Sequence, residues 1–261
     1  YGIPTFADNV APVDDPTIGR LRSAGAIPIA KTNQPEMAMR LATDNPLFGL
    51  TRNPWHPDRT ASGSSGGDAS AIASGMTPMG MGSDLGGSVR NPAYACGIAA
   101  TKTSLGRLPV HGTSPRASEA LLGRQLMAVA GPMARSVADL EAMLRVTVGR
   151  HPRDPRSVDV PHDGRNFIRR AAVPTDLPGE PIHPDAREAV RRAGEALAAA
   201  GWDVVDATPP EMERCYDVWG RLLGEDFPMT MEALSAVMSD DGAHLIRSSM
   251  AFWPAGEVAP Q

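Results

Sequence analysis

Residues 63–93, GSSGGDASAIASGMTPMGMGSDLGGSVRNPA, contain two clusters of glycine and serine that are joined by a run with almost no charge. The first cluster holds Ser64 and the second holds Ser88. Between them, an acidic residue in the first turn and a closing glycine predict a helix over residues 67–75. The alternating Met and Gly that follow predict a buried strand over residues 76–82. The stretch therefore reads as loop, helix, strand and loop, with hydroxyl groups on both loops.

Helix and strand signals continue on both sides of this stretch. Asp15 before a proline predicts a capped helix that ends at Gly25, and Ser136 caps a helix predicted over residues 136–148. Further predictions are strands at 26–30 and 97–104, a strand–helix–strand pattern from RRAAVP through WDVVDA, and helices near 211–224 and 229–239. Strands and helices mixed in this order favour an α/β layer structure.

The stretch GRHPRDPRSVDVPHDG, residues 149–164, is either a domain linker or a surface crossing. Because α/β elements continue on both sides of it, we expect one domain over residues 1–261. The chain starts at Tyr1 in the middle of a pattern and stops at AFWPAGEVAPQ without a closing element. We therefore interpret it as an internal piece of a longer polypeptide, incomplete at both ends.

Composition narrows the class of protein. The chain has 261 residues, 42% of them hydrophobic, and a net charge of −5, so it has no basic surface for nucleic acid or an anionic membrane. No apolar run approaches the length of a membrane span, and the first residues do not have the pattern of a signal peptide. Cys96 and Cys215 are too few for a disulfide framework or a zinc site. These features predict a cytoplasmic protein without a metal.

Three interpretations compete for the two clusters. Glycine and serine are ordinary turn residues, which is the plain structural interpretation. A phosphate-binding loop needs G-x-x-x-x-G-K-[ST], but the first cluster has no lysine and Asp68 would repel a phosphate. Residues 63–67 formally match the G-x-S-x-G nucleophile elbow, but no buried strand precedes them. The six histidines stand mostly in loop sequence, so none is an evident general base.

Ser88 fits the role of a nucleophile better. Leu85, Gly86 and Gly87 precede it, and consecutive backbone N–H groups without bulky side chains can form an oxyanion hole. A serine hydroxyl also needs a proton acceptor, because its own pKa makes it a poor nucleophile. Ser64 could relay that proton if the two loops meet and if a neutral lysine, whose pKa burial has lowered, accepts the proton in turn.

At these residues the sequence resembles the amidase signature family. The resemblance runs nearly throughout residues 60–93 and extends to RLRSAGAIPIAKTNQPEMA, TDNPLFGLTRNPW, CGIAATKTSLGRLPV and GPMARSVADL, in the family's order. It implies a large α/β fold with a mixed central β-sheet flanked by helices. It also implies hydrolysis of a small-molecule amide by a Ser–cis-Ser–Lys triad without a cofactor. A homodimer is left open.

The resemblance assigns roles position by position. Ser88 corresponds to the nucleophile that forms the acyl-enzyme, and Ser64 to the cis-peptide serine that relays the proton. Leu85, Gly86 and Gly87 correspond to the oxyanion-hole segment. The supporting positions are Ser65, expected to hydrogen-bond within the site, and Asp84 and Arg90, expected to brace the loop as an ion pair.

One part of the family pattern is missing from this chain. The family's lysine belongs to a KDN-like strand upstream of the cis-serine, and neither Lys31 in AKTN nor Lys102 in TKTS matches it. Ser62 also stands where the family commonly has glycine. We therefore expect the intact protein to be an amidase and residues 1–261 alone to be nearly inactive. Two alternatives stay open: an amidotransferase A-type subunit that releases ammonia from glutamine for tRNA-dependent amidation, and a non-catalytic binding member.

Overall fold

A computed structural model describes residues 2–110, 122–162, 168–174, 177 and 181–252. The described residues form two compact units, the first from residues 1–160 and 226–252 and the second from residues 161–225. The division falls within the Pro/Arg/Asp-rich stretch 149–164. A single amidase-type domain over residues 1–261 stays a prediction.

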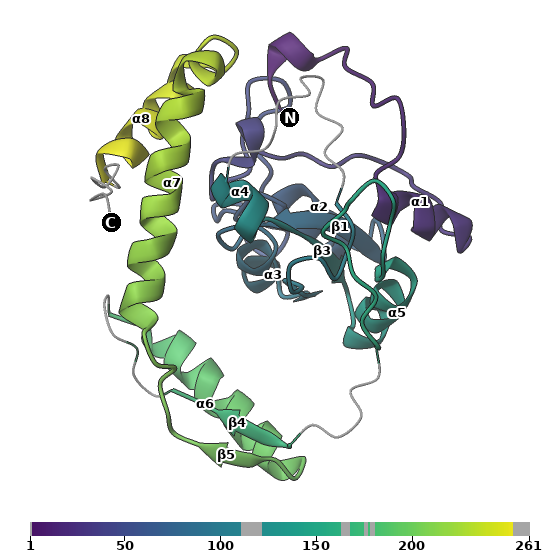
Figure 1. Cartoon of the computed structure of the whole chain (residues 1–261), viewed down its shortest axis with the longest axis vertical. Helices are drawn as coiled ribbons and strands as arrows, with labels where there is room; N and C mark the ends of the chain where they lie inside the picture. The colour runs from purple at the N-terminus through teal and green to yellow at the C-terminus, as the bar shows by residue number, and fades with distance from the viewer. Residues whose placement is uncertain (1, 111–121, 163–167, 175–176, 178–180, 253–261) are drawn as a thin grey trace. The chain divides into compact units, whose positions relative to one another are not determined.

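A three-stranded antiparallel sheet lies at the centre of the first unit (Figure 1). Strand β3 (Val129–Ala134) is the middle strand, between β1 (Met79–Asp84) and β2 (Ala99–Ala100). In the register of the β1–β3 pair, Met79 lies opposite Ala134 and Asp84 lies opposite Val129. All six residues of β3 are buried, as expected for a central strand covered on both faces.

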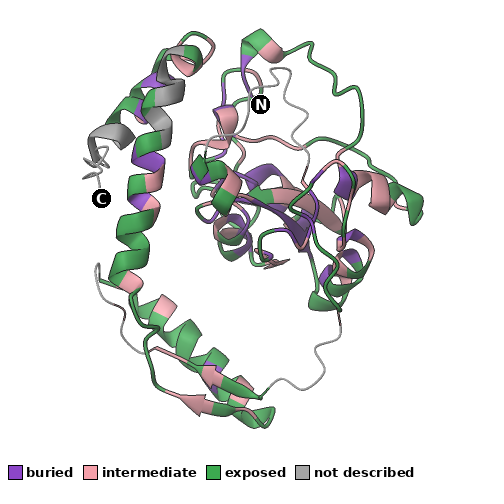
Figure 2. Ribbon diagram, viewed as in Figure 1, coloured by how far each residue is buried: buried purple, intermediate pink, exposed green. Residues whose placement is uncertain are grey.

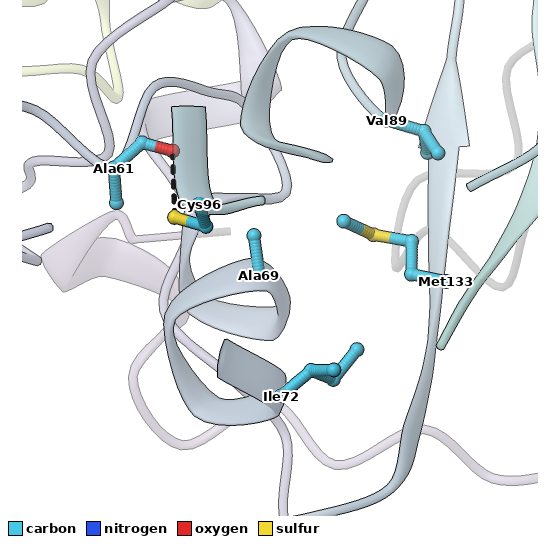
Figure 3. Close-up of a cluster of buried hydrophobic side chains, with 6 residues drawn as sticks. All are labelled: Ala61, Ala69, Ile72, Val89, Cys96 and Met133. Carbon is cyan, nitrogen blue, oxygen red and sulfur yellow. Dashed lines mark hydrogen bonds between the residues drawn. The ribbon is translucent and has the colours of Figure 1, made fainter. Parts of the chain in front are cut away.

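Helices cover both faces of this sheet. On one face, α2 (Gly66–Ala73) and α3 (Arg90–Cys96) pack against Met133 in a cluster of buried residues (Figure 3). In this cluster the Cys96 Sγ contacts the Ala61 carbonyl oxygen at 3.8 Å. On the other face, α1 (Pro16–Ser23) and α5 (Val137–Thr147) pack against Ala134. Neighbouring strand residues point to opposite faces, so Met133 and Ala134 belong to different cores.

The alternating Met and Gly of β1 have a packing reason. Met79 and Met81 pack with the α1 and α5 core, so the two glycines between and after them face α2. A Cβ atom at Gly80 would lie 2.5 Å from Asp68 Oδ1, and one at Gly82 would lie 2.4 Å from Ser65 Oγ. Because both contacts are shorter than van der Waals distances, only glycine lets the start of α2 approach this strand.

Capping residues define several helix ends, as the sequence predicts. The Asp15 carboxylate accepts from the Thr17 N–H at 3.0 Å, and Ser136 Oγ accepts from the Asp139 N–H at 3.1 Å. At the other end of α5, the Arg20 guanidinium of α1 donates to the carbonyl oxygens of Thr147, Val148, Gly149 and Arg150. A cation at a helix C-terminus is favourable, so this side chain ties α1 to α5.

The second unit contains the predicted strand–helix–strand pattern. Strands β4 (Arg170–Ala172) and β5 (Asp203–Val205) pair in parallel, and α6 (Pro184–Ala199) connects them. Most of α6 is exposed (Figure 2). The remaining elements are the short helices η1 (Pro4–Phe6), η2 (Glu36–Ala38) and α4 (Leu122–Met127), and the helices α7 (Met212–Ser235) and α8 (Asp240–Phe252).

Two predictions of secondary structure were wrong. Residues 26–30 form no strand: Ile27 and Ile29 are 82% and 68% exposed, and no described strand pairs with them. The expected break between helices at residues 224–229 does not occur, because α7 continues through Pro228 to Ser235. The helix that follows, α8, lies beyond the predicted range 229–239 and was not predicted. The predicted strand at 97–104 is reduced to the two residues of β2.

Candidate active site

The two serine loops meet through their backbones. The Ser65 N–H donates to the Ser88 carbonyl oxygen at 3.0 Å. The peptide bond between Gly63 and Ser64 is cis, as the family resemblance implies, and Ser64 is only 2% exposed. Ser88 lies at the turn that leads from β1 into α3 and is partly accessible. The structure therefore brings residues 64–65 and 88 together from two segments of the chain.

Thr43 holds the first loop in place. Its Oγ1 donates to the Ser62 carbonyl oxygen at 2.8 Å and accepts from the Gly66 N–H at 3.1 Å, and it lies 3.4 Å from the Ser64 carbonyl oxygen. The side chain is fully buried. Ser62 has a φ of 62°, in the left-handed region that favours glycine, which accounts for the glycine that the family commonly has there.

Asp84 organises the second loop. Its carboxylate accepts from the backbone N–H groups of Gly87, Val89 and Arg90 and from the Arg90 guanidinium, whose Nη2 lies 2.9 Å from Oδ1. Burial alone would raise the pKa of Asp84, but the hydrogen bonds from Arg90 and from the three N–H groups outweigh it and hold this pKa below its ordinary value. The bracing pair expected at these two positions is present.

The oxyanion-hole segment divides into two kinds of N–H group. The Gly87 N–H donates to Asp84 Oδ1 at 2.8 Å, so it is already engaged. The N–H groups of Leu85, Gly86 and Ser88 have no hydrogen-bond acceptor among the described residues. Gly87 has a φ of 112°, and a Cβ atom there would lie 2.5 Å from Asn91 Nδ2. Gly87 thus shapes the turn, while the other three N–H groups remain available to a ligand.

Ser65 contributes its backbone rather than its side chain. Apart from the N–H that reaches Ser88, no hydrogen bond of its hydroxyl is found within the described part of the chain. Its Oγ faces Gly82 and borders a pocket that also contains Asp68. Burial raises the pKa of Asp68 to about 6, although a hydrogen bond from Thr32 acts in the opposite direction.

Neither lysine of the chain contacts the serine pair. Lys31 is exposed. Lys102 donates to the Met127 carbonyl oxygen at 3.1 Å, and burial holds its pKa below the ordinary value, while the charge of Asp84 acts in the opposite direction. The prediction that neither lysine takes the triad position stays a prediction.

Sequence reasoning missed Thr43 and the environment of Asp68. Thr43 hydrogen-bonds to Gly66, which lies 23 residues away in the sequence. Thr32 hydrogen-bonds to Asp68, which lies 36 residues away. The only signal for Thr43 is the family resemblance of the TDNPLFG block that contains it.

Within the described ranges, no group of three or more His, Cys, Asp or Glu could hold a metal ion, and no helix is long and apolar enough to cross a membrane.

Comparisons with known proteins identify the family of the chain. A family model described as Amidase matches residues 1–260. An indoleacetamide hydrolase of Bradyrhizobium diazoefficiens is 39% identical over 246 residues, which are 92% of this chain and 46% of that protein. The A-type subunit of the glutamyl-tRNA(Gln) amidotransferase of Synechococcus sp. (strain RCC307) is 37% identical over 215 residues, which are 78% of this chain and 42% of that protein.

Solved structures give the same result for the fold. The crystal structure of a bacterial aryl acylamidase of the amidase signature family matches with a TM-score of 0.73 and 25% identity, over 96% of this chain and 53% of that chain. The chain spans about half the length of the relatives it matches. The α/β fold is therefore confirmed as the corresponding part of an amidase signature fold. Since the family model covers nearly every residue, the chain belongs to the amidase family.

Proposed function

We propose that the intact protein hydrolyses a carboxylic acid amide to the acid and ammonia or an amine, through an acyl-enzyme on Ser88. The observation that carries this proposal is the hydrogen bond from the Ser65 N–H to the Ser88 carbonyl oxygen. It joins the two serine loops beside three N–H groups that have no acceptor among the described residues. The match to an indoleacetamide hydrolase supports a primary amide as substrate.

The reaction follows from these positions. Ser88 Oγ attacks the amide carbonyl carbon, and its proton passes to Ser64 Oγ as Ser64 gives up its own proton to a base. The N–H groups of Leu85, Gly86 and Ser88 donate to the carbonyl oxygen as it gains negative charge. Ser64 then protonates the leaving nitrogen as the C–N bond breaks, and water hydrolyses the ester by the reverse proton path.

The base is the component that these residues do not supply. The family resemblance implies a neutral lysine, and neither Lys31 nor Lys102 has the matching sequence. We propose that the lysine lies in a segment outside residues 1–261, so that this chain alone has little activity. In this proposal no metal or organic cofactor takes part, and the reaction takes place in the cytoplasm.

Replacement of the nucleophile tests the proposal. In the intact protein, Ser88→Ala removes the attacking oxygen and should lower kcat for release of ammonia from indoleacetamide by more than about 10³-fold. The matched control is Ser74→Ala, because Ser74 is an exposed serine at the end of α2 and should leave kcat unchanged. Turnover by Ser88→Ala at the level of the control would refute the assignment.

A second function is favoured by the 37% identity to the A-type subunit of an amidotransferase. Such a protein would release ammonia from glutamine with the same serine pair, and only together with partner subunits. Glutamine and indoleacetamide, compared as substrates for the intact protein alone and with candidate partner subunits, separate the two. Release of ammonia from glutamine that depends on partner subunits would favour the amidotransferase.

A further inference from the structure

The first serine loop, which carries Ser64, rests on the backbone of an earlier segment, residues 40–43. A Cβ atom at Gly63 would lie only 2.7 Å from the Arg40 carbonyl oxygen, so the two stretches of backbone approach each other too closely for a side chain at this position. At the end of the segment, the Thr43 hydroxyl makes two hydrogen bonds to the same loop. The position of the loop therefore depends on where this segment lies.

The other end of the segment is anchored on α8. The Arg40 guanidinium pairs with Asp241 in the first turn of that helix. Four residues earlier, the buried Glu36 carboxylate accepts from the Ser239 N–H at 2.8 Å and from its Oγ at 2.6 Å. All of these residues belong to the first compact unit. Residues 36–40 thus connect the N-terminus of α8 to the segment that supports the first serine loop.

The turn between these two anchors has an unfavourable backbone conformation. Met37 and Ala38 have φ values of 52° and 60°, in the left-handed region that residues with a Cβ atom rarely adopt. Such residues keep this conformation only where the surrounding structure determines it. Glu36 and Arg40 flank the turn, so their bonds to α8 fix both of its ends.

The pair between Arg40 and Asp241 orients the segment more than it stabilises the fold. The Arg40 side chain is 18% exposed and that of Asp241 is 78% exposed, and an ion pair with an exposed carboxylate contributes little to stability. Among the described residues, the buried Nε of Arg40 has no acceptor. The direction of the guanidinium is therefore set by Asp241.

We propose that Arg40 is a positioning residue for the proton relay between Ser88 and Ser64. Its pair with Asp241 holds residues 40–43 against the first serine loop, and this contact sets the place of the relay hydroxyl. Arg40 acts through the backbone and does not contact the substrate. The inference rests on the proposed function, because it is the proposed reaction that assigns Ser64 to the relay.

Steady-state kinetics of the intact protein with indoleacetamide test this role. Arg40→Ala should lower kcat by about tenfold, since a misplacement of about 1 Å is enough to slow a reaction markedly. KM should stay unchanged, because no contact with the substrate is lost. Asp241→Asn should have a similar effect, and the double variant should be no slower than Arg40→Ala. Arg40→Lys keeps a positive charge beside Asp241 and should recover part of kcat.

Hydrogen exchange measures the same displacement without an activity assay. The N–H groups of Ser65 and Gly66 are hydrogen-bonded within the site and should exchange faster once the loop shifts. Mass spectrometry should show this in Arg40→Ala, while Tm falls by no more than a few degrees. The matched control is Arg22→Ala, which removes an exposed pair with Asp14 and should change neither kcat nor exchange at the two N–H groups.

Three results would overturn the proposal. A raised KM with unchanged kcat in Arg40→Ala would mean that Arg40 contacts the substrate. Unchanged kcat together with unchanged exchange would mean that it does not position the loop. Additive losses in the double variant would mean that it acts independently of Asp241. If Arg40→Ala does not fold, Asp241→Asn carries the same test, because its parent side chain is exposed.

Failure of this proposal and failure of the proposed function are distinguishable. Each of the three results leaves the Ser88→Ala test unaffected. Turnover by Ser88→Ala would remove the nucleophile from the proposed reaction, but the exchange measurement on Arg40→Ala would still report whether α8 positions the first serine loop.

Discussion

The hydroxyl group of Thr43 joins a segment that carries no proposed chemistry to the loop that carries Ser64. Thr43→Val keeps the shape of the side chain but leaves the buried Gly66 N–H and the Ser62 carbonyl oxygen without this partner. A buried polar group without a hydrogen bond costs about 1–3 kcal/mol. We expect Thr43→Val to lower the free energy of unfolding by this amount and to lower kcat in the intact protein, as measured by urea unfolding and amide hydrolysis.

Thr43→Ser is the matched control, because it retains the hydroxyl group and loses only a methyl group. It should keep most of kcat and lose stability only through the small cavity. Equal loss of kcat in both variants would show that packing, and not the hydrogen bonds, positions Ser64.

At the residue scale, the sequence could predict contacts within one turn but not contacts between distant segments. Asp84 and Arg90 are six residues apart on the turn that carries Ser88, so their pairing follows from local spacing. The partners of Thr43 and Asp68 are 23 and 36 residues away, and no local pattern specifies them. The hydrogen bond from the Gly87 N–H to Asp84 spans only three residues, but from the sequence this N–H was expected in the oxyanion hole instead.

Helices were predicted best where the sequence contains both an N-cap residue and a residue that ends the helix. Asp15 and Ser136 accept from N–H groups as expected because each needs only its own next residues. Residues 26–30 were predicted as a strand from their apolar side chains, but a strand also needs a neighbour, and no described strand supplies one. Two helices were predicted near 211–224 and 229–239, but a single helix, α7, continues through Pro228 to Ser235.

The start of α8 depends on a side chain from a distant segment. The Glu36 carboxylate, which is buried, accepts from the Ser239 N–H at 2.8 Å and from its Oγ at 2.6 Å. Arg40 also pairs with Asp241 in the first turn of this helix. Residues near η2 therefore hold the N-terminus of α8.

Glu36→Ala should release this helix. The Ser239 N–H and hydroxyl would lose their acceptor, which we expect to cost about 1–3 kcal/mol and to speed backbone hydrogen exchange in α8 by about tenfold or more. Mass spectrometry of exchange over residues 239–252 measures this. Glu36→Gln retains one acceptor oxygen and should show a smaller increase, while Glu213→Ala, an exposed site in α7, should show none. Exchange in α8 that is unchanged in Glu36→Ala would contradict the role.

At the scale of the whole molecule, two carboxylic acids near the serine loops give opposite pH dependences of stability. The pKa of Asp68 is raised to about 6 from 3.8, so its contribution is complete at low pH and is lost as pH rises through about 6. The pKa of Asp84 is lowered from 3.8, so its contribution is present above 3.8 and is lost as pH falls through the lower native value. The ionised form of Asp84 therefore stabilises the loop that carries Ser88, whereas the surroundings of Asp68 favour its protonated form.

Asp84→Asn isolates the second of these effects. The amide cannot accept from Arg90 and three backbone N–H groups as a carboxylate does. Because the Arg90 side chain is 53% exposed, the main cost is that of the unmet backbone donors, about 1–3 kcal/mol. We therefore expect the variant to have a lower urea midpoint than the wild type at pH 7, by a difference that stays constant down to about pH 4.5. The difference should shrink below pH 3.8, the ordinary value, because protonation removes the same charge from the wild type. Asp58→Asn should follow the wild type at every pH. A difference that widens on acidification would mean that the native pKa of Asp84 is raised and that the loop bearing Ser88 is held by something other than this carboxylate.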